Sequence, residues 1–338
     1  MSSRPQQELL PLLKAVSRSF YLTIRVMPSA VRGQIGLAYL LARATDTIAD
    51  TELVPVEKRL QKLQELRAAI LSGSGPAPDF FSLASCQSAS AEKFLLQELP
   101  SVLQLLRSTQ ETERRLIQQV LDTITSGQEL DLRRFGTPHP GVVHALKTTD
   151  ELEDYTWRVA GCVGEFWTEI CLLRLFPATA DLRKQLLEDG KRFGQGLQLV
   201  NILRDIPRDL ANGRCYIPEE ALNRIGMAPA ALLDPNNEPT FRAVYNPLLK
   251  KAENFLEAGW RYTNALPRNQ VRVRLACAWP VLIGIQTVQK LKIGKILDPG
   301  IPIKIPRKNV RQIIFQTISA HYFPRRWNRL YEMVRDQA

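Results

Sequence analysis

Apolar residues recur every three or four positions over most of the chain, in segments separated by short stretches rich in proline, glycine and polar residues. Such periodicity predicts amphipathic α-helices. The segments with the clearest pattern are 9–16, 29–50, 57–72, 92–135 with a break at Pro100, 242–266 and 271–291. No stretch alternates apolar and polar residues between turn signals at strand spacing, so strands are not expected. The pattern therefore predicts a nearly all-α protein.

Two helical segments carry aspartates one turn apart among apolar residues. Asp46 and Asp50 lie in the first, and Asp205 and Asp209 lie in a second that ends near Gly213. Residues four apart face the same side of a helix, so each pair can direct its oxygens towards one hard cation. We interpret the two pairs as lining one cleft between two helices, each with a polar face that is mostly buried.

Ordinary helix surface also carries such pairs, and chance supplies about half of one in a chain with this many aspartates. A third pair, Asp150 and Asp154, follows Thr149. We interpret this one as structural, because Thr149 is a suitable N-cap and acids in a first turn complement the helix dipole. The other pairs lie within apolar patterns, where an unpaired buried carboxylate is costly. That cost favours a functional role for them.

Charge and cysteine content narrow the class of protein. The formal net charge of +11 favours an anionic partner, which leaves nucleic acid, an acidic membrane surface or a phosphorylated substrate. The five cysteines are scattered, without a CxxC motif, as is typical of a reducing cytosol. The start of the chain lacks the apolar core of a signal peptide, and the longest apolar run, 275–285, contains Pro280 and is too short to span a bilayer. We therefore expect a cytoplasmic protein without a transmembrane helix, either free or peripheral at a membrane.

The acidic pairs suggest a type of substrate. Carboxylates without histidine or cysteine partners favour Mg²⁺ over zinc, and Mg²⁺ on carboxylates favours a substrate with phosphates. Several arginines near the motifs can neutralise the remaining phosphate charge: Arg18, Arg43, Arg204, Arg208 and Arg214. The apolar surroundings favour a long hydrocarbon part. A diphosphate joined to a hydrocarbon meets both requirements.

Two further motifs are ambiguous from the residues alone. The segment 17–20, Ser-Arg-Ser-Phe, is typical of a helix N-cap and also of a phosphate site, and spacing alone favours the cap. Tyr155 precedes a segment with small residues at 160, 161 and 164, which predict the close approach of another backbone. A lone tyrosine in such a place is more often a packed core residue than an acid or base.

Taken together, these motifs resemble those of the trans head-to-head prenyl synthases, the squalene and phytoene synthase family. The matching segments occur in family order at 17–20, 43–50, 155–161, 198–209 and 213–218. The resemblance extends over nearly the whole chain. It implies the all-α isoprenoid synthase fold as a single domain of residues 1–338, with a central cleft between two Asp-bearing helices and a basic C-terminal tail of about residues 299–338.

The resemblance also implies roles for individual residues. The residues implied to hold Mg²⁺ and take part in catalysis are Asp46, Asp50, Asp205 and Asp209, with Tyr155 as a further catalytic residue in the first half-reaction. The residues implied to bind substrate are Ser17, Arg18, Ser19, Phe20, Arg43, Gln198, Asn201, Arg204 and Arg214. The implied reaction joins two prenyl diphosphates through a cyclopropyl intermediate.

The product depends on how that intermediate is consumed. The segment 288–295 resembles the squalene synthase region in which a basic cluster meets NADPH, and the residues implied to bind this cofactor are Lys292, Arg18, Arg43 and Arg204. We therefore expect two farnesyl diphosphates to be converted to squalene with NADPH. The alternatives are phytoene, dehydrosqualene or presqualene diphosphate synthesis without a reductive step. Arg158, Ala49 and Pro207 depart from the family pattern, and Pro207 is expected to kink its helix.

A hypothesis of another class is a non-catalytic, basic helical module that binds a membrane or nucleic acid. The tail supports it, because arginines there alternate with aromatic residues such as Trp327 and Tyr331, which would lie at a membrane interface. This hypothesis leaves the two acidic pairs unexplained. We therefore expect an enzyme with no nucleic acid partner, and peripheral membrane binding through the tail.

Overall fold

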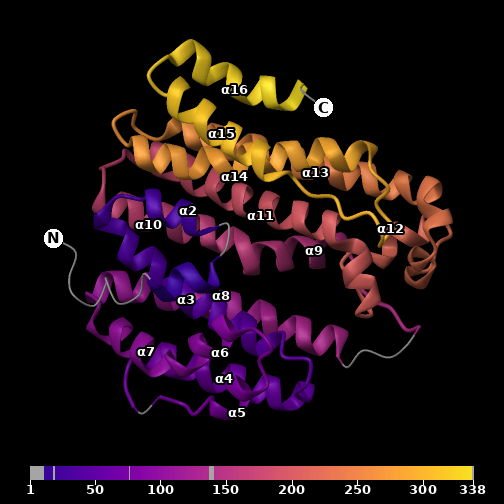
Figure 1. Ribbon diagram of the computed structural model, residues 1–338, viewed down its shortest axis with the longest axis horizontal. Coiled ribbons are helices and arrows are strands. Elements are labelled where there is room, and N and C mark those ends of the chain that lie inside the picture. Colours follow the sequence, from indigo (N-terminus) through magenta and orange to yellow (C-terminus); the bar gives the residue numbers. More distant parts are fainter. Residues whose placement is uncertain (1–10, 18–19, 76, 137–140, 337–338) are drawn as a thin grey trace. The chain divides into compact units, whose positions relative to one another are not determined.

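The computed structural model describes residues 11–17, 20–75, 77–136 and 141–336 (Figure 1). It is about 78% helical. Within these ranges the strands are limited to one parallel pair of two-residue strands, β1 (His144–Ala145) and β2 (Arg214–Cys215). The prediction of an all-α protein is confirmed.

The chain forms two compact units. Unit 1 comprises the described residues within Met1–Thr137 and Phe166–Pro177, and unit 2 those within Pro138–Glu165 and Ala178–Ala338. Asp46 and Asp50 belong to unit 1, whereas Asp205 and Asp209 belong to unit 2. The single domain and the central cleft between the two acidic helices therefore stay predictions.

Unit 1 is built around the first acidic helix. Its helices are α2 (Phe20–Val26), α3 (Ser29–Ala49), α4 (Val56–Ser72), α5 (Phe81–Ser85), α6 (Ser90–Gln97), α7 (Leu99–Ser108) and α8 (Glu111–Phe135), with the end of α10 (Cys162–Arg174). α3 packs on α4, α7 and α8, and it buries the apolar positions 31, 35, 37, 41, 44 and 48. Of these, positions 37, 41, 44 and 48 lie on the side of the helix opposite Asp46 and Asp50.

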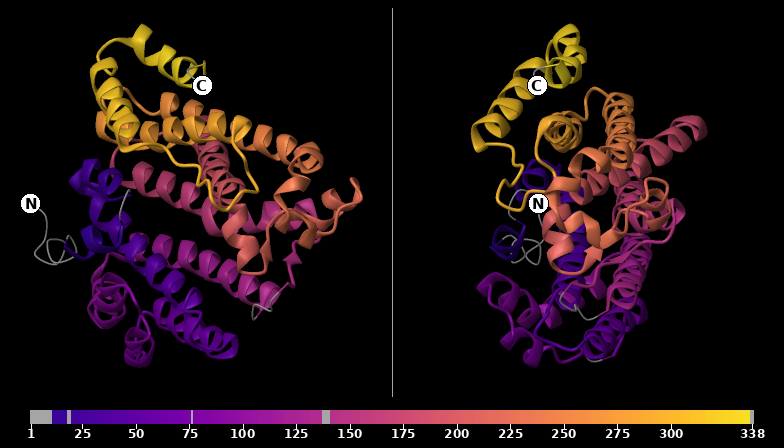
Figure 2. Two further views of the ribbon diagram at one scale, coloured as in Figure 1. Left: turned by 45° about the vertical axis from the view of Figure 1, so that its right-hand side comes forward. Right: turned by 90° about the vertical axis from the view of Figure 1, so that its right-hand side faces the viewer.

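Unit 2 is built around the second acidic helix. Its elements are α9 (Thr149–Thr156), the π-helix η1 (Trp157–Gly161), the start of α10, α11 (Ala180–Ala211), α12 (Glu219–Asn223), the 3₁₀ turns η2 (Pro229–Leu233) and η3 (Pro235–Asn237), α13 (Glu238–Ala265), α14 (Val271–Ile293), α15 (Arg307–Ala320) and α16 (Pro324–Asp336). α11 packs most extensively on α13 and also contacts α14, α9 and η1 (Figure 2). The second acidic motif therefore lies on a helix that is held by contacts with several other elements of unit 2.

Small residues allow α11 to approach the η1–α10 segment closely. A Cβ atom added to Gly164 would lie 1.9 Å from the carbonyl oxygen of Gly190, and one added to Gly194 would lie 2.1 Å from that of Ala160. Backbone cannot retreat as a side chain can, so only glycine fits at these two positions. The predicted close approach at residues 160–164 is confirmed, and the partner is α11.

α14 has the length and composition of a membrane span, although Pro280 lies within it. Its mean hydropathy over the most apolar window is 1.3, and 72% of that window is buried within the protein. A core helix of a globular protein meets the same criteria. The helix continues through Pro280 to Ile293, which matches the predicted segment 271–291 and is longer than its apolar run 275–285.

Two aromatic residues of the tail, Trp327 and Tyr331, are core residues. Trp327 and Tyr331 are only 2% and 6% exposed, and both rings stack on Trp260 of α13. The Trp327 indole donates a 2.7 Å hydrogen bond to Asn264, and the guanidinium of Arg274 lies 4.8 Å from its ring centroid. The expectation that these two aromatics lie at a membrane interface is wrong, because they anchor α16 to unit 2.

Candidate active site

The acidic pair of unit 1 lies at the C-terminal end of α3. Arg43, one turn before Asp46, donates a 2.5 Å hydrogen bond to its carboxylate and also pairs with Glu92 of α6. Asp50 is the C-cap residue of α3, so both aspartates lie on its last turn. The guanidinium is thus shared between two acids, and Asp50 adds a further negative charge nearby.

This shortage of positive charge changes the acidity of Asp46. Burial and the charge of Asp50 raise the pKa of Asp46 to about 6, although Arg43 opposes the shift. Its side chain is nevertheless 44% exposed, so the carboxylate is crowded by protein and still reached by solvent. A carboxylate with a raised pKa gains from a bound cation, which replaces the missing positive charge.

The negative charge of the acidic pair in unit 2 is more nearly neutralised than that of the pair in unit 1. Arg204 forms two hydrogen bonds of 2.8 and 2.7 Å with the carboxylate of its neighbour Asp205. These bonds raise the pKa of Arg204 despite its burial, so the guanidinium is a fixed cation. Asp209 follows one turn later on the same helix. Arg204 therefore belongs to the acidic motif itself.

The polar face of α11 is less buried than the sequence suggested. Gln198, Asp205 and Asp209 are half-buried, and Asn201 is exposed. The expectation of a mostly buried polar face is wrong for this helix. Apolar neighbours at 199, 200, 202 and 203 are buried instead, which leaves the polar positions with access to solvent and to a ligand.

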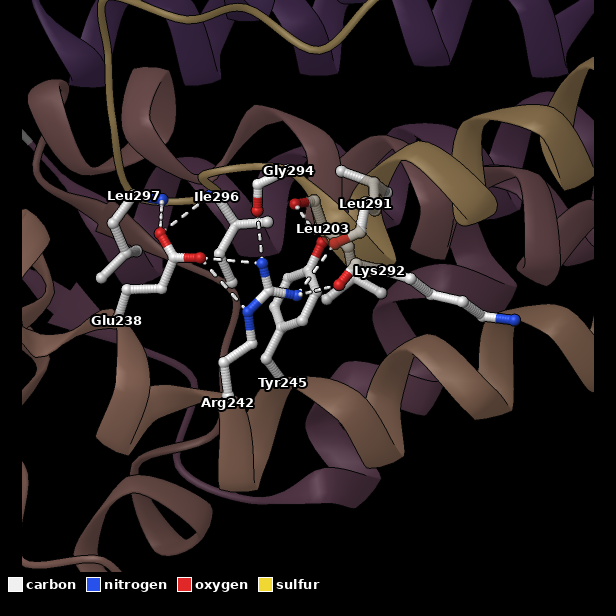
Figure 3. A network of polar contacts seen from close by, with 9 residues as sticks. All are labelled: Leu203, Glu238, Arg242, Tyr245, Leu291, Lys292, Gly294, Ile296 and Leu297. Atoms are coloured by element: carbon white, nitrogen blue, oxygen red, sulfur yellow. Dashed lines mark hydrogen bonds and ion pairs between the residues drawn. The ribbon is translucent and has the colours of Figure 1, made fainter. Parts of the chain in front are cut away.

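α11 runs without interruption through Pro207, because another residue compensates for the missing amide. Proline has no N–H, so it cannot donate the usual helical hydrogen bond to the carbonyl of Leu203. The hydroxyl of Tyr245 donates to that carbonyl at 3.2 Å, and Tyr245 is fully buried on α13 (Figure 3). Burial raises the pKa of this phenol above its ordinary value, which keeps the proton in place. Tyr245 thus supports the turn that carries Asp205.

The same part of α13 also fixes the end of α14. Arg242, whose guanidinium lies 5.2 Å from the Tyr245 ring, donates to the carbonyls of Leu291, Lys292 and Gly294. Glu238 pairs with Arg242 and accepts hydrogen bonds from the amides of Ile296 and Leu297 (Figure 3). Nothing in the spacing of these residues indicated the network. It connects the acidic motif of α11 to the segment predicted to bind NADPH.

Tyr155 lies on α9 and is stacked on a second tyrosine. The ring centroids of Tyr155 and Tyr216 are 4.8 Å apart, and their hydroxyls are 3.4 Å apart. The β1–β2 pair explains the contact, because it aligns His144 with Arg214 and so brings the segment after α11 beside the start of α9. Tyr216 was missed, although it lies inside the quoted motif 213–218. It gives the phenol of Tyr155 a partner for proton transfer.

A π-helical turn follows Tyr155 directly. The segment Trp157–Gly161 replaces regular α-helix between α9 and α10. Such turns cost stability and are frequent at functional sites. Arg158, which departs from the family pattern, pairs with Asp154 at 2.8 Å. The N-cap of α9 is Thr148 rather than the predicted Thr149.

The remaining predicted substrate residues are only partly described. Ser17 is buried and its hydroxyl donates to the carbonyl of Leu13, so its donor is used within the protein. Arg18 and Ser19 lie outside the described residues, and Phe20 is described only as the first residue of α2. Arg214 is a half-buried residue of β2.

Lys292, the predicted NADPH residue, is paired with an acid. Its ammonium lies 3.0 Å from Glu253, whose other oxygen is 2.9 Å from Lys250. Although burial opposes the shift, these two lysines lower the pKa of Glu253, so this carboxylate is charged. Two cations share one acid, which leaves the cluster with a net positive charge.

The residues of both pairs fit Mg²⁺ by their chemistry. Within the part of the chain that the structure describes, no three or more of His, Cys, Asp and Glu gather as a ready metal site. Mg²⁺ commonly binds through one or two carboxylates together with substrate phosphates. Two carboxylates one turn apart, with the raised pKa of Asp46, are consistent with that mode.

The chain is similar in sequence to curated proteins that share one description. The chain is 27% identical over 309 residues to a bifunctional lycopene cyclase/phytoene synthase from Phaeosphaeria nodorum, which covers 90% of the chain and 48% of that protein. A protein of the same description from Blakeslea trispora is 29% identical over 219 residues, covering 63% of the chain and 32% of the relative. The chain thus spans about half the length, or less, of these curated relatives.

Solved structures share the fold. The complex of TcSQS with the ligand E5700 gives a TM-score of 0.75 at 20% identity and covers 98% of this chain and 97% of that one. A dehydrosqualene synthase in complex with a ligand gives 0.64 at 21% identity, covering 94% and 96%. The sequence profile described as squalene/phytoene synthase matches residues 13–295. Because that match includes most of the chain, the protein belongs to the squalene/phytoene synthase family.

Proposed function

We propose that the protein catalyses the Mg²⁺-dependent, head-to-head condensation of two prenyl diphosphates. The observation that carries the proposal is that each unit presents an i,i+4 aspartate pair beside an arginine, namely Asp46 with Arg43 and Asp205 with Arg204. A diphosphate binds to cations such as arginine and Mg²⁺, and bound Mg²⁺ in turn needs carboxylate ligands. Each motif supplies one arginine and two carboxylates.

Bound Mg²⁺ would neutralise the diphosphate charge and so favour its departure. Asp46 and Asp50 would hold one ion through their oxygens, and Asp205 and Asp209 another. Arg43 and Arg204 would bind phosphate oxygens with the donors that their aspartates leave unused. The Nε atom of Arg43 is buried and makes no hydrogen bond among the described residues, which leaves it available.

The first half-reaction follows from the loss of one diphosphate. The C–O bond breaks with both electrons leaving on diphosphate, and the resulting allylic cation is attacked by the double bond of the second substrate. Proton loss from the adduct then closes a cyclopropane. Tyr155, stacked on Tyr216, is the residue that we expect to assist the departing diphosphate and the proton transfer.

We propose that a second ionisation rearranges the ring and that hydride from NADPH ends the sequence as squalene. The support is that Lys292, at the end of α14, shares Glu253 with Lys250 and is therefore only partly neutralised, with Lys295 just beyond it. A hydride donor has to be anchored by its phosphates, and no dinucleotide fold is expected here to do so. Arg18, Arg43 and Arg204 stay predicted NADPH residues. Farnesyl diphosphate is then the expected substrate.

A second candidate ends with proton loss and gives phytoene or dehydrosqualene. The names of the curated relatives favour it, since they are phytoene synthases. The ion pair between Lys292 and Glu253 favours it too, because a nucleotide phosphate would compete with a well-buried carboxylate. Geranylgeranyl diphosphate would be the expected substrate for phytoene.

The two endings are separated by incubating the protein with Mg²⁺ and labelled farnesyl or geranylgeranyl diphosphate, with and without NADPH. Squalene that forms only with NADPH supports the reductive ending. The same hydrocarbon under both conditions, or use of the C20 substrate alone, supports the second candidate. Absence of any coupled product refutes condensation itself.

Lys292→Ala sharpens that assay. The reductive proposal expects a raised KM for NADPH and more unreduced product, while the first half-reaction continues. Lys250→Ala is the matched control, because it removes the other cation from Glu253. Equal effects of the two variants would mean that Lys292 only neutralises Glu253.

We also propose a cytoplasmic location. The five cysteines are all free, and burial raises the pKa of Cys162, Cys171 and Cys215 to about 12. Thiols of that kind persist in a reducing compartment. Alkylation under denaturing conditions of the protein extracted from cells, followed by mass spectrometry, should find these thiols reduced.

A further inference from the structure

The end of unit 2 carries an unbalanced positive charge. Between Gly300 and Tyr331 the sequence has no aspartate or glutamate. The lysines and arginines of this segment are all exposed, and they are Lys304, Arg307, Lys308, Arg311, Arg325, Arg326 and Arg329. The ion pairs found among the described residues include none of them. Much of the net charge of +11 therefore lies on this segment.

An apolar stripe lies on the same segment. Phe315 and Tyr322 are 73% and 77% exposed, and Ile318 between them is 46% exposed. Their spacing places the three on one face of α15 and its C-terminal turn. Phe323 adds a further ring, 54% exposed. The buried face of α15 is formed by Ile313, Thr317 and Ala320.

Cations flank this stripe. Arg311 precedes Phe315 by one helical turn and is exposed on the same face. The guanidinium of Arg326 lies 5.1 Å from the centroid of the Phe323 ring. Large exposed aromatics beside arginines are typical of a surface that inserts its rings at a lipid headgroup boundary.

The exposed residues lie on helices that pack on the core of unit 2. α15 and α16, at the yellow end of the chain in Figures 1 and 2, both pack on α14. Trp279 of α14 donates a 2.9 Å hydrogen bond to Thr317 of α15, and buried Trp327 anchors α16. The exposed rings are therefore presented by folded helices.

We propose that the stripe of Phe315, Ile318, Tyr322 and Phe323, with its flanking arginines, is a docking surface for an anionic lipid bilayer. Charge complementarity selects this occupant, because lysines and arginines gain from each anionic headgroup. Nucleic acid would leave the aliphatic Ile318 unexplained, and a second copy would bring like charges together. The biological use rests on the proposed function, since a long hydrocarbon product has to leave for a membrane.

Vesicle sedimentation of the full chain tests the surface. The vesicles are phosphatidylcholine alone or phosphatidylcholine mixed with phosphatidylglycerol. Binding should require the anionic lipid and should fall as salt increases, since exposed charges are screened. The double variant Phe315→Ser/Tyr322→Ser should lower the partition coefficient by at least about tenfold, because two large apolar side chains no longer insert.

Phe81→Ser/Leu53→Ser is the matched control, because these side chains of unit 1 are 70% and 81% exposed. It should bind vesicles like the wild type. Equal sedimentation with both lipids, loss of binding in the control, or preferential binding to duplex DNA would each overturn the proposal. Sedimentation needs no substrate, so diphosphate release measured in detergent separates its failure from a failure of the proposed condensation.

Discussion

The acidic motifs of α3 and α11 share their spacing but differ in electrostatic balance. In α3 one arginine serves Asp46 and Glu92, and Asp50 adds negative charge, so the pKa of Asp46 rises to about 6. In α11 Arg204 forms a bidentate pair with Asp205 and also interacts with the charge of Asp209. The carboxylates of the first motif are therefore less well neutralised than Asp205 of the second. Identical spacing does not give identical sites.

The largest effect that tests this comparison is the loss of turnover. Asp46→Asn and Asp205→Asn should each lower kcat/KM by at least about 100-fold, because each removes a negative oxygen from a predicted Mg²⁺ site. The two should differ in their dependence on Mg²⁺. Added metal should restore less activity to Asp46→Asn, since the arginine of its motif is shared with Glu92. Near-normal activity of either variant at saturating Mg²⁺ would break the comparison.

Tyr155→Phe probes the residue that is predicted to assist the first half-reaction. The first half-reaction should slow by about 100-fold or more, because the phenol can no longer donate or relay a proton. Supplied presqualene diphosphate should restore product formation in part. Tyr216→Phe is the comparison variant, since it keeps the stacked ring. If Tyr155→Phe forms the cyclopropyl intermediate at the wild-type rate, Tyr155 is a packed core residue.

The two helices also differ in their support, because only α11 contains a proline beside its acids. Tyr245→Phe should lower the free energy of unfolding by about 1–3 kcal/mol, since the carbonyl of Leu203 loses its donor. In a Pro207→Ala background the restored amide should reduce that loss, giving a coupling of about 1 kcal/mol. Urea denaturation of the four proteins measures it. Equal losses in both backgrounds would show that Tyr245 does not compensate for Pro207.

The smallest expected effect is on thermal stability, because Asp46→Asn and Asp205→Asn should change Tm in opposite directions. An aspartate whose folded pKa lies above its unfolded value binds protons better when folded, so ionisation costs stability as pH rises from about 4 to about 6. Asp46→Asn should therefore raise Tm by a few degrees at most at pH 7 and leave it nearly unchanged at pH 4. Asp205→Asn should lower Tm at pH 7, because Arg204 loses its partner. Equal signs at pH 7 would contradict the proposed difference in balance.

The sequence predicted the features that depend on local spacing. Helical periodicity placed the aspartates of α3 and α11 on helices, and the small residues around Gly161 predicted the close approach of another backbone, which is that of α11. The break at Pro100 was also predicted and lies at the start of α7, whereas the second break, before Glu111, was missed. Periodicity does not register such short breaks.

Features that depend on contacts between distant residues were missed. Glu92 lies 49 positions from Arg43, and Tyr245 lies 42 positions from the carbonyl that it supports. Burial was also predicted wrongly for two aromatic residues of the tail, because aromatic residues are common both in protein cores and at membrane interfaces. Trp327 and Tyr331 are residue types common at membrane interfaces, yet in this protein they pack in the core against Trp260, and Trp327 also bonds to Asn264. Only the packing of α13 against α16 distinguishes a core position from an interfacial one.

The central claim is condensation of two prenyl diphosphates, and the stoichiometry of diphosphate release tests it most directly. Incubation with Mg²⁺, NADPH and farnesyl diphosphate should release two diphosphates for each coupled hydrocarbon formed, and a chelator should stop the release. Without NADPH, a ratio of one diphosphate for each cyclopropyl product is expected. Release of diphosphate that yields only farnesol, with no coupled product from C15 or C20 substrate, would contradict the account.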